Sequence, residues 1–212
     1  MTPKPGAADA ARGRVLFGDH DGGERGRPGN LFASRGRLKA AAPVAALMVS
    51  DLLAPELKLV FCGYNPSLAS GSTGHHYAHP GNRFWRVLFA SGITNRLYEP
   101  GEDEQLLNLG IGFTNLCSRP TRRADELTRE EIRSGADELR EKLERFQPRA
   151  VAYTGIGVYR WFRATSKVAW GLQETRAVLG TTDVVVPSPS GLNRMRFEEL
   201  VDHYRALTPF LA

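Results

Sequence analysis

The sequence predicts an α/β protein with a mainly parallel sheet covered by helices on both faces. Two observations predict this class. Short apolar segments alternate with segments of helical periodicity from about residue 46 onward, which is the pattern of parallel strands joined by crossover helices. Polar loops marked by proline and glycine follow three of the apolar segments. Ligands bind at the carboxyl ends of the strands in such sheets, so we expect these loops to form a site.

The expected strands are short apolar runs that end in glycine or in a polar turn. They cover residues 57–63, 112–117, 149–155 and 182–191, the last of which continues into a turn. Cys62 and Cys117 lie at the ends of two of these strands. We expect both to be buried thiols, because two cysteines in apolar surroundings do not indicate a disulfide framework.

The expected helices show apolar residues at helical spacing. They cover residues 82–92, 102–110, 128–148, 156–165 and 197–210. The clearest of them is 128–148, "TREEIRSGADELREKLERFQP". Thr128 is the expected N-cap, Glu131 completes a capping box three residues later, and Pro148 follows the end.

Residues 1–45 lack periodicity and are rich in glycine, alanine and arginine. We expect a disordered, mildly basic extension there, followed by a single domain over 46–212. The hydrophobic share of 42% and the charged share of 24% are typical of a soluble globular protein. No secretory or membrane-spanning segment is apparent, so we expect a cytoplasmic protein. The net charge of +5 favours an anionic partner, nucleic acid first.

The first polar loop, 63–81, holds the candidates for chemistry. Asn65 in "GYNP" either opens a turn or orients a water or a substrate edge. Tyr77 either stacks on a flat ligand such as a nucleobase or anchors the loop to the core. The histidines of "HHYAHP" fit no zinc pattern well, so we do not expect a metal site.

The other two loops are 118–126 and 187–194. In "SPSGLNR", Leu192 suits a wedge between base pairs and Arg194 suits a phosphate, whereas the alternative is a plain turn with Leu192 packed inward. Asp125 stands among arginines after a strand. It either supplies a catalytic carboxylate, or it caps a helix or pairs with Arg122 or Arg123.

Three of these stretches together resemble a known family. "GYNPSLASGSTGHHYAHPGNRFW" and "PSPSGLNR" look like the two signatures of the mismatch-specific uracil-DNA glycosylases, relatives of thymine-DNA glycosylase, and "GFTNLCSRPTRRADEL" looks like the segment between them. The resemblance covers about residues 55–210. It implies a three-layer α/β/α sandwich with a short, mainly parallel central sheet. The implied reaction is hydrolysis of the N-glycosidic bond of uracil, and of related damaged or mispaired pyrimidines, in double-stranded DNA, preferentially opposite guanine, which leaves an abasic site. It implies no metal and no cofactor, and a monomer is usual for such an enzyme.

The resemblance also implies roles for single residues. Asn65 would position the attacking water, and Tyr77 would stack on the flipped base. The base pocket would also include Tyr64, Ser70 and Asn115, with backbone amides near Tyr64 and Tyr77 at the carbonyls of the base. The segment that enters the duplex comprises Ser190, Gly191, Leu192, Asn193 and Arg194. Leu192 would fill the space in the duplex that the flipped base leaves. Main-chain groups beside it would pair with the unpaired guanine, and Arg194 would lie near the DNA backbone.

The sequence departs from the family pattern at several site positions. Ser188 and Asn115 stand where the family has asparagine and lysine, Asn193 replaces a small serine, and "HHY" replaces a more apolar pair. These changes predict a more polar pocket. Three alternatives stay open: a uracil glycosylase with little preference for the opposing base, a DNA-binding module without chemistry, and a hydrolase of small nucleosides or nucleotides.

Overall fold

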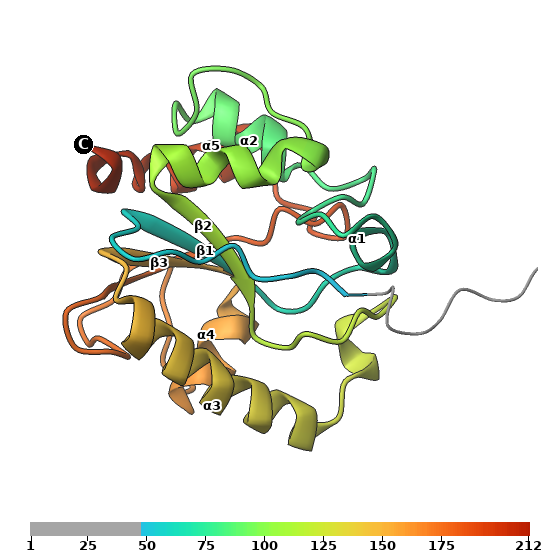
Figure 1. Ribbon diagram of the computed structural model, residues 1–212, viewed down its shortest axis with the longest axis vertical. Coiled ribbons are helices and arrows are strands. Elements are labelled where there is room, and N and C mark those ends of the chain that lie inside the picture. Colours follow the sequence, from blue (N-terminus) through green and yellow to red (C-terminus); the bar gives the residue numbers. More distant parts are fainter. Residues whose placement is uncertain (1–47) are drawn as a thin grey trace, which may run out of the picture. The chain divides into compact units, whose positions relative to one another are not determined.

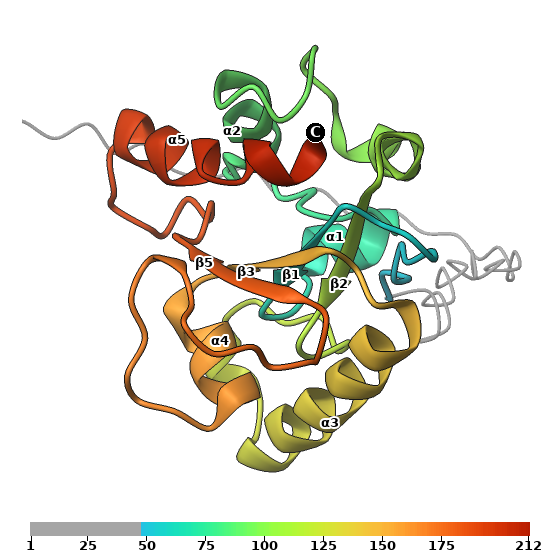
Figure 2. The same cartoon turned by 90° about the vertical axis from the view of Figure 1, so that its left-hand side faces the viewer.

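The computed structural model describes residues 48–212, and the extension predicted over residues 1–45 lies outside the described residues. Its centre is a five-stranded sheet with the order β2-β1-β3-β5-β4 (Figures 1 and 2). The strands are β1 (Leu59–Gly63), β2 (Ile111–Asn115), β3 (Ala150–Thr154), β4 (Gly171–Leu172) and β5 (Thr182–Val186). All neighbours are parallel except β4, which pairs antiparallel with β5 at the edge. This confirms the predicted class.

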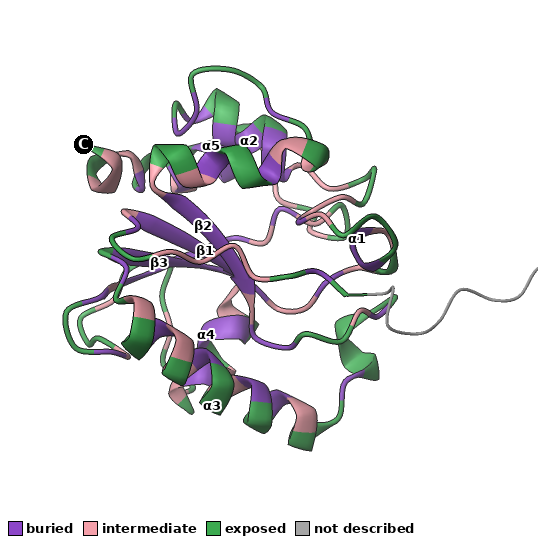
Figure 3. Cartoon of the chain, in the orientation of Figure 1, coloured by how far each residue is buried: buried purple, intermediate pink, exposed green. Residues whose placement is uncertain are grey.

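Two layers of helices cover the sheet. Helices α2 (Phe84–Ala90) and α5 (Phe197–Arg205) lie on one face, and α3 (Arg129–Phe146) and α4 (Ile156–Arg163) lie on the other (Figure 1). Each layer closes its own hydrophobic core, one around Phe61, Phe84 and Phe113, the other around Val60, Leu139 and Tyr153. Every residue of β1 is buried (Figure 3), as expected for a strand covered on both sides.

The ends of the helices follow local rules that the sequence displays. The capping box of α3 is present as predicted, with Thr128 and Glu131 bonded to each other's backbone N–H. The helix stops at Phe146 because Gln147 takes the left-handed conformation before Pro148. The helix predicted over 102–110 is a 3₁₀ helix over Pro100–Leu109 instead, closed by a capping box at Glu99 and by left-handed Gly110.

The first polar loop contains a helix that the sequence analysis missed. Helix α1 spans Leu68–Thr73. The Ser67 side chain accepts the backbone N–H of Ser70 at 3.0 Å, and Gly74 closes the helix in the left-handed conformation. A serine N-cap seven positions before a glycine C-cap was the available signal.

The glycine at position 135 lets α3 approach the segment that follows β2. A Cβ atom on Gly135 would overlap the carbonyl group of Leu116, which is backbone and cannot turn away. We expect Gly135→Ala to destabilise the protein by about 1–3 kcal/mol, although alanine favours an ordinary helix over glycine by roughly 1 kcal/mol. Urea unfolding measures this, with exposed Ser134→Ala in the same helix as the control. An unchanged or increased stability would show that α3 can shift at no cost.

Both cysteines are buried and free, as predicted. Burial raises the pKa of the Cys117 thiol to about 11 and the pKa of the Cys62 thiol further, so both are neutral at physiological pH. Within residues 48–212, no helix combines the length and the apolar character that crossing a membrane requires.

Candidate functional site

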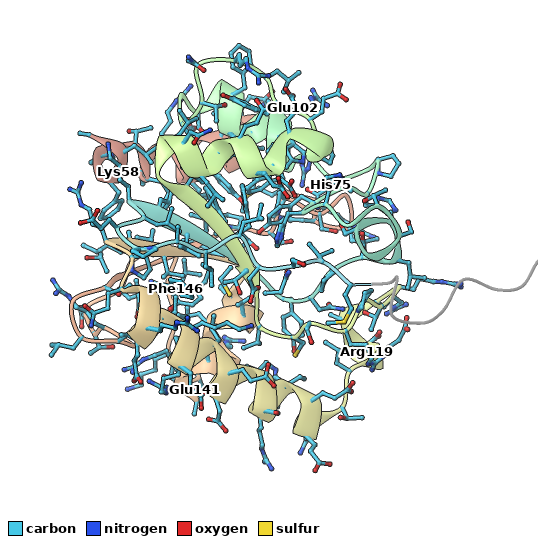
Figure 4. The ribbon with its side chains drawn as sticks, viewed as in Figure 1. Lys58, His75, Glu102, Arg119, Glu141 and Phe146 are labelled. Carbon is cyan, nitrogen blue, oxygen red and sulfur yellow. The ribbon has the colours of Figure 1, made fainter. Side chains whose placement is uncertain are left out.

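The three polar loops meet in one cavity of about 810 Å³ at the carboxyl end of the sheet. The last residues of three neighbouring strands form its floor, namely Gly63, Asn115 and Thr154. Residues from 64–82, 121–125 and 188–192 supply its walls. Figure 4 labels His75 and Arg119 at this end of the molecule, whereas Lys58 and Phe146 lie at the opposite end. The parallel topology thus brings together segments that are more than a hundred residues apart.

Asn65 lines this cavity with a side chain of fixed orientation. Its Nδ2 donates to the backbone oxygen of Arg119 at 3.0 Å and to Oγ1 of Thr121 at 2.7 Å. The Thr121 hydroxyl donates its own hydrogen to the Arg123 carbonyl at 2.7 Å, so it can only accept from Asn65. With the Pro66 carbonyl at 3.2 Å, three acceptors hold the NH₂ group, and Oδ1 has no hydrogen-bond partner among residues 48–212.

Tyr77 presents an aromatic ring at the same cavity. The ring stacks on Phe84 with centroids 3.8 Å apart and planes at 10°. Its hydroxyl lies 3.4 Å from Oγ1 of Thr154, which itself donates to the Cys62 carbonyl. The Tyr77 backbone is left-handed, with φ of 53°, which is unusual for a bulky residue and marks a constrained loop. Burial raises the pKa of the phenol, so the ring is neutral.

A buried carboxylate binds the two histidines that precede Tyr77. Asp103 accepts the backbone N–H of His76 at 2.8 Å and lies 3.0 Å from Nδ1 of His75. The Nε2 of His76 lies 3.0 Å from the Ser50 carbonyl, which requires a proton on that nitrogen. Burial lowers the pKa of His76 and keeps the ring neutral. The sequence gives no signal that Asp103 belongs to the site, because the residue lies in a helix remote from the loop along the chain.

The histidines therefore have separate partners. The Nδ1 of His79 accepts the N–H of Gly81 at 3.0 Å, and this ring lies at the cavity wall. Among the residues that the structure describes, no group of three His, Cys, Asp or Glu side chains could hold a metal ion.

Asn115 offers an unengaged amide on the cavity floor. It stands opposite Gly63 in the sheet register, at the ends of β2 and β1. Its side chain makes no hydrogen bond within the described part of the chain. A Cβ atom on Gly63 would lie 2.5 Å from its Oδ1, so the glycine makes the room that this amide occupies. An asparagine there can both donate to and accept from a ligand edge.

Ser70 and Tyr64 also line the cavity. The Ser70 hydroxyl accepts from the N–H of Ala78 at 3.1 Å and from Oγ of Ser67 at 3.1 Å, so it joins the two ends of the first loop and keeps one hydrogen to donate. Tyr64 is half-buried beside Gly157 at the start of α4. Burial raises the pKa of its hydroxyl.

Asp125 lies at the cavity wall in a short 3₁₀ helix, Ala124–Glu126. Its carboxylate forms a bidentate pair with Arg123, at 2.8 and 3.2 Å. The side chain is 64% exposed. This is the pairing that the sequence analysis gave as the alternative to a catalytic role.

The third loop presents Leu192 to solvent. This leucine is 83% exposed, so the alternative in which it packs inward is wrong. Asn193 fastens the loop to itself, because its Nδ2 donates to the Ser188 carbonyl at 2.8 Å and its Oδ1 accepts the Met195 N–H at 3.0 Å. Ser190, Gly191 and Leu192 border the cavity, whereas Asn193 and Arg194 lie beyond its lining. Arg194 is exposed.

The fold and the cavity define a class of protein: an α/β ligand-binding protein whose site lies at the carboxyl ends of parallel strands. Residues 50–212 match the family model of the Uracil DNA glycosylase superfamily. The chain belongs to this superfamily, whose members are DNA glycosylases, hydrolases that act on DNA.

One solved structure similar to this chain is the solution NMR structure of a candidate uracil DNA glycosylase from Methanosarcina acetivorans. The two chains are 21% identical, with a TM-score of 0.49. The match covers 77% of this chain and 98% of the other.

Proposed function

We propose that this protein removes uracil from double-stranded DNA, preferentially where uracil lies opposite guanine, by hydrolysing the bond between base and sugar. The observation that carries the proposal is the fixed amide of Asn65 in a cavity with an aromatic ring. The NH₂ group is held by Arg119 and Thr121, and the free carbonyl oxygen is left as an acceptor. Such an oxygen can orient a water for attack.

The reaction follows from what an amide can and cannot do. Asn65 cannot take a proton as a carboxylate does, so it positions the water without acting as a strong base. The C1′–N1 bond breaks and its electron pair leaves with the base. The sugar then gains positive character, as in other glycoside hydrolyses. The water oxygen bonds to C1′ and its proton passes to solvent or to the departing base.

The remaining cavity residues suit a flipped pyrimidine. Tyr77 stacks on Phe84 and lines the cavity, so its ring is placed to stack on the base as well. Asn115 can pair with the base edge through its unengaged amide. The backbone N–H of Tyr77 donates to no described residue, so it is available to a carbonyl of the base. A donor there would stabilise the charge that develops on the leaving group.

Preference for guanine rests on the exposed third loop. Leu192 is exposed beside the cavity, which supports a role as a wedge that fills the gap left by a flipped base. Extrusion of a base costs a few kcal/mol, least at a mispair. A protein without a strong general base would therefore act most readily on weakened pairs.

Three labelled substrates test the proposal: uracil opposite guanine, uracil opposite adenine, and uracil in a single strand. Alkali after incubation breaks the strand at any abasic site. We expect cleavage mainly at the guanine pair. Equal cleavage of all three would support a broad uracil glycosylase and contradict the guanine preference. Binding without cleavage would overturn the proposed reaction and favour the module without chemistry.

A further inference from the structure

Arg83 connects the first loop to the third. Its NH1 donates to the Met195 carbonyl at 2.7 Å, and its NH2 donates to the carbonyls of Asn193 at 2.9 Å and Ser190 at 3.3 Å. Its backbone N–H donates to the Pro189 carbonyl at 2.9 Å. Arg83, the residue directly before α2, thus binds four carbonyl groups in and next to the loop that carries Leu192.

Among the described residues, the guanidinium of Arg83 donates only to backbone carbonyls. Within residues 48–212, no carboxylate pairs with its guanidinium, and its Nε is buried without a hydrogen-bond partner. Burial of an unpaired donor costs free energy. The three carbonyl bonds of the guanidinium therefore fix the loop geometry although one of its donors stays unpaired.

A second contact fastens the two loops at the tip. A Cβ atom on Gly191 would lie 2.6 Å from the Gly81 carbonyl oxygen, so only glycine permits this approach of the two backbones. The contact is independent of the Arg83 side chain. Gly81 at the end of the first loop and Arg83 just after it therefore hold the third loop at two points beside Leu192.

The contacts of Arg83 and Gly81 with the third loop, called the clamp below, engage most of the backbone carbonyls around Leu192. The carbonyls of Ser188, Pro189, Ser190, Asn193 and Met195 all accept hydrogen bonds. In contrast, the carbonyls of Gly191, Leu192 and Arg194 accept none from the described residues, and the first two lie directly beside the leucine side chain. The Watson–Crick edge of guanine presents two adjacent donor groups, whereas adenine presents a donor and an acceptor. Two free carbonyls beside the wedge match guanine.

We propose that Arg83 is a positioning residue that preforms the loop 188–195 before DNA arrives. It holds Leu192 outward and fixes the backbone on either side of it, so that the loop meets the duplex without first having to be ordered. The inference rests on the proposed function for its DNA target, but the preformed loop does not depend on it. Arg83 touches no reacting atom and acts through the loop.

Two readouts on Arg83→Ala test the proposal. The first is amide hydrogen exchange of the peptide 188–195 in the absence of DNA. We expect exchange there to rise at least about tenfold while the strands β1 and β3 keep their protection. The second is single-turnover cleavage. We expect a loss of roughly 10–100-fold on uracil opposite guanine, but a change within about twofold on single-stranded uracil, where no wedge is needed.

Arg86→Ala is the matched control, because Arg86 lies three residues further on in α2 and contacts Phe197 instead of the loop. It should leave both readouts unchanged. If Arg83→Ala loses protection throughout the chain, Gly191→Ala disturbs the same clamp from the other side. It should produce the same local rise in exchange and the same loss limited to duplex DNA.

The outcomes separate this proposal from the proposed function. Unchanged exchange in the loop overturns the role of Arg83, as does an equal loss on duplex and single strand. A wild type that cleaves no uracil overturns the proposed function, and loop exchange then still decides this proposal. If the wild type does not cut single strands, a binding measurement replaces the single-strand cleavage assay. It compares the affinity for a stable abasic analogue opposite guanine with the affinity for the same analogue opposite adenine. Arg83→Ala should reduce the ratio of the two affinities.

Discussion

Replacing Asn65 by alanine is expected to lower the single-turnover rate of uracil release by roughly 10²–10⁴-fold, with little change in the affinity for DNA. The side chain is the group that would orient the water, and alanine leaves that water without its acceptor. A quenched-flow or manual assay on uracil opposite guanine measures the rate, and binding to a duplex with an uncleavable analogue measures the affinity.

Two further variants show whether the orientation of the amide matters. Thr121→Ala keeps Oδ1 of Asn65 but removes one of the acceptors that hold its NH₂ group, so an intermediate loss is expected. Asn108→Ala changes an exposed asparagine outside the cavity lining and should leave the rate unchanged. An Asn65→Ala enzyme with the wild-type rate would contradict the assigned role and direct attention to Asp125.

Replacing Asp183 by asparagine is expected to destabilise the protein by about 1–3 kcal/mol. This buried carboxylate in β5 accepts three hydrogen bonds, from the hydroxyls of Tyr153 and Tyr159 at 3.1 Å and from the N–H of Ala177 at 2.6 Å. The side-chain amide of asparagine has only one oxygen. Its NH₂ group would therefore face at least one of these three donors, and the hydrogen bond there would be lost. Urea unfolding at fixed pH measures the loss, with the exposed Asp202→Asn as the control.

The pH dependence of that loss follows from the pKa of Asp183. Burial raises the pKa of this carboxyl above its ordinary value, so the folded state binds its proton more tightly than the unfolded state. Its contribution to stability is complete below the unfolded pKa, near 3.9, and is lost as pH rises through the folded pKa. The difference in unfolding free energy between wild type and Asp183→Asn should therefore shrink as pH rises. A difference that grows with pH would contradict this.

Much of the fold could be predicted because its signals are local. The apolar run before Gly63 and the capping box at Thr128 each depend on residues within a few positions of one another. The placement of Asn65 and Tyr77 near a ligand site followed from one topological rule, since loops after parallel strands gather at one edge. The edge strand β4 and the helix α1 were not predicted, because β4 has only two residues and α1 only six. Segments this short show no clear hydrophobic periodicity.

The sequence by itself determined the α/β class, the three site loops, and the residue types that suit base recognition. Only the tertiary structure decided how those residues are held. Asn65 is oriented by Thr121, 56 residues away, and Arg83 clamps the third loop through Met195, 112 residues away. Periodicity and capping report neighbours along the chain, whereas these bonds arise where separate segments pack at one end of the sheet. Their geometry exists only once the sheet has formed.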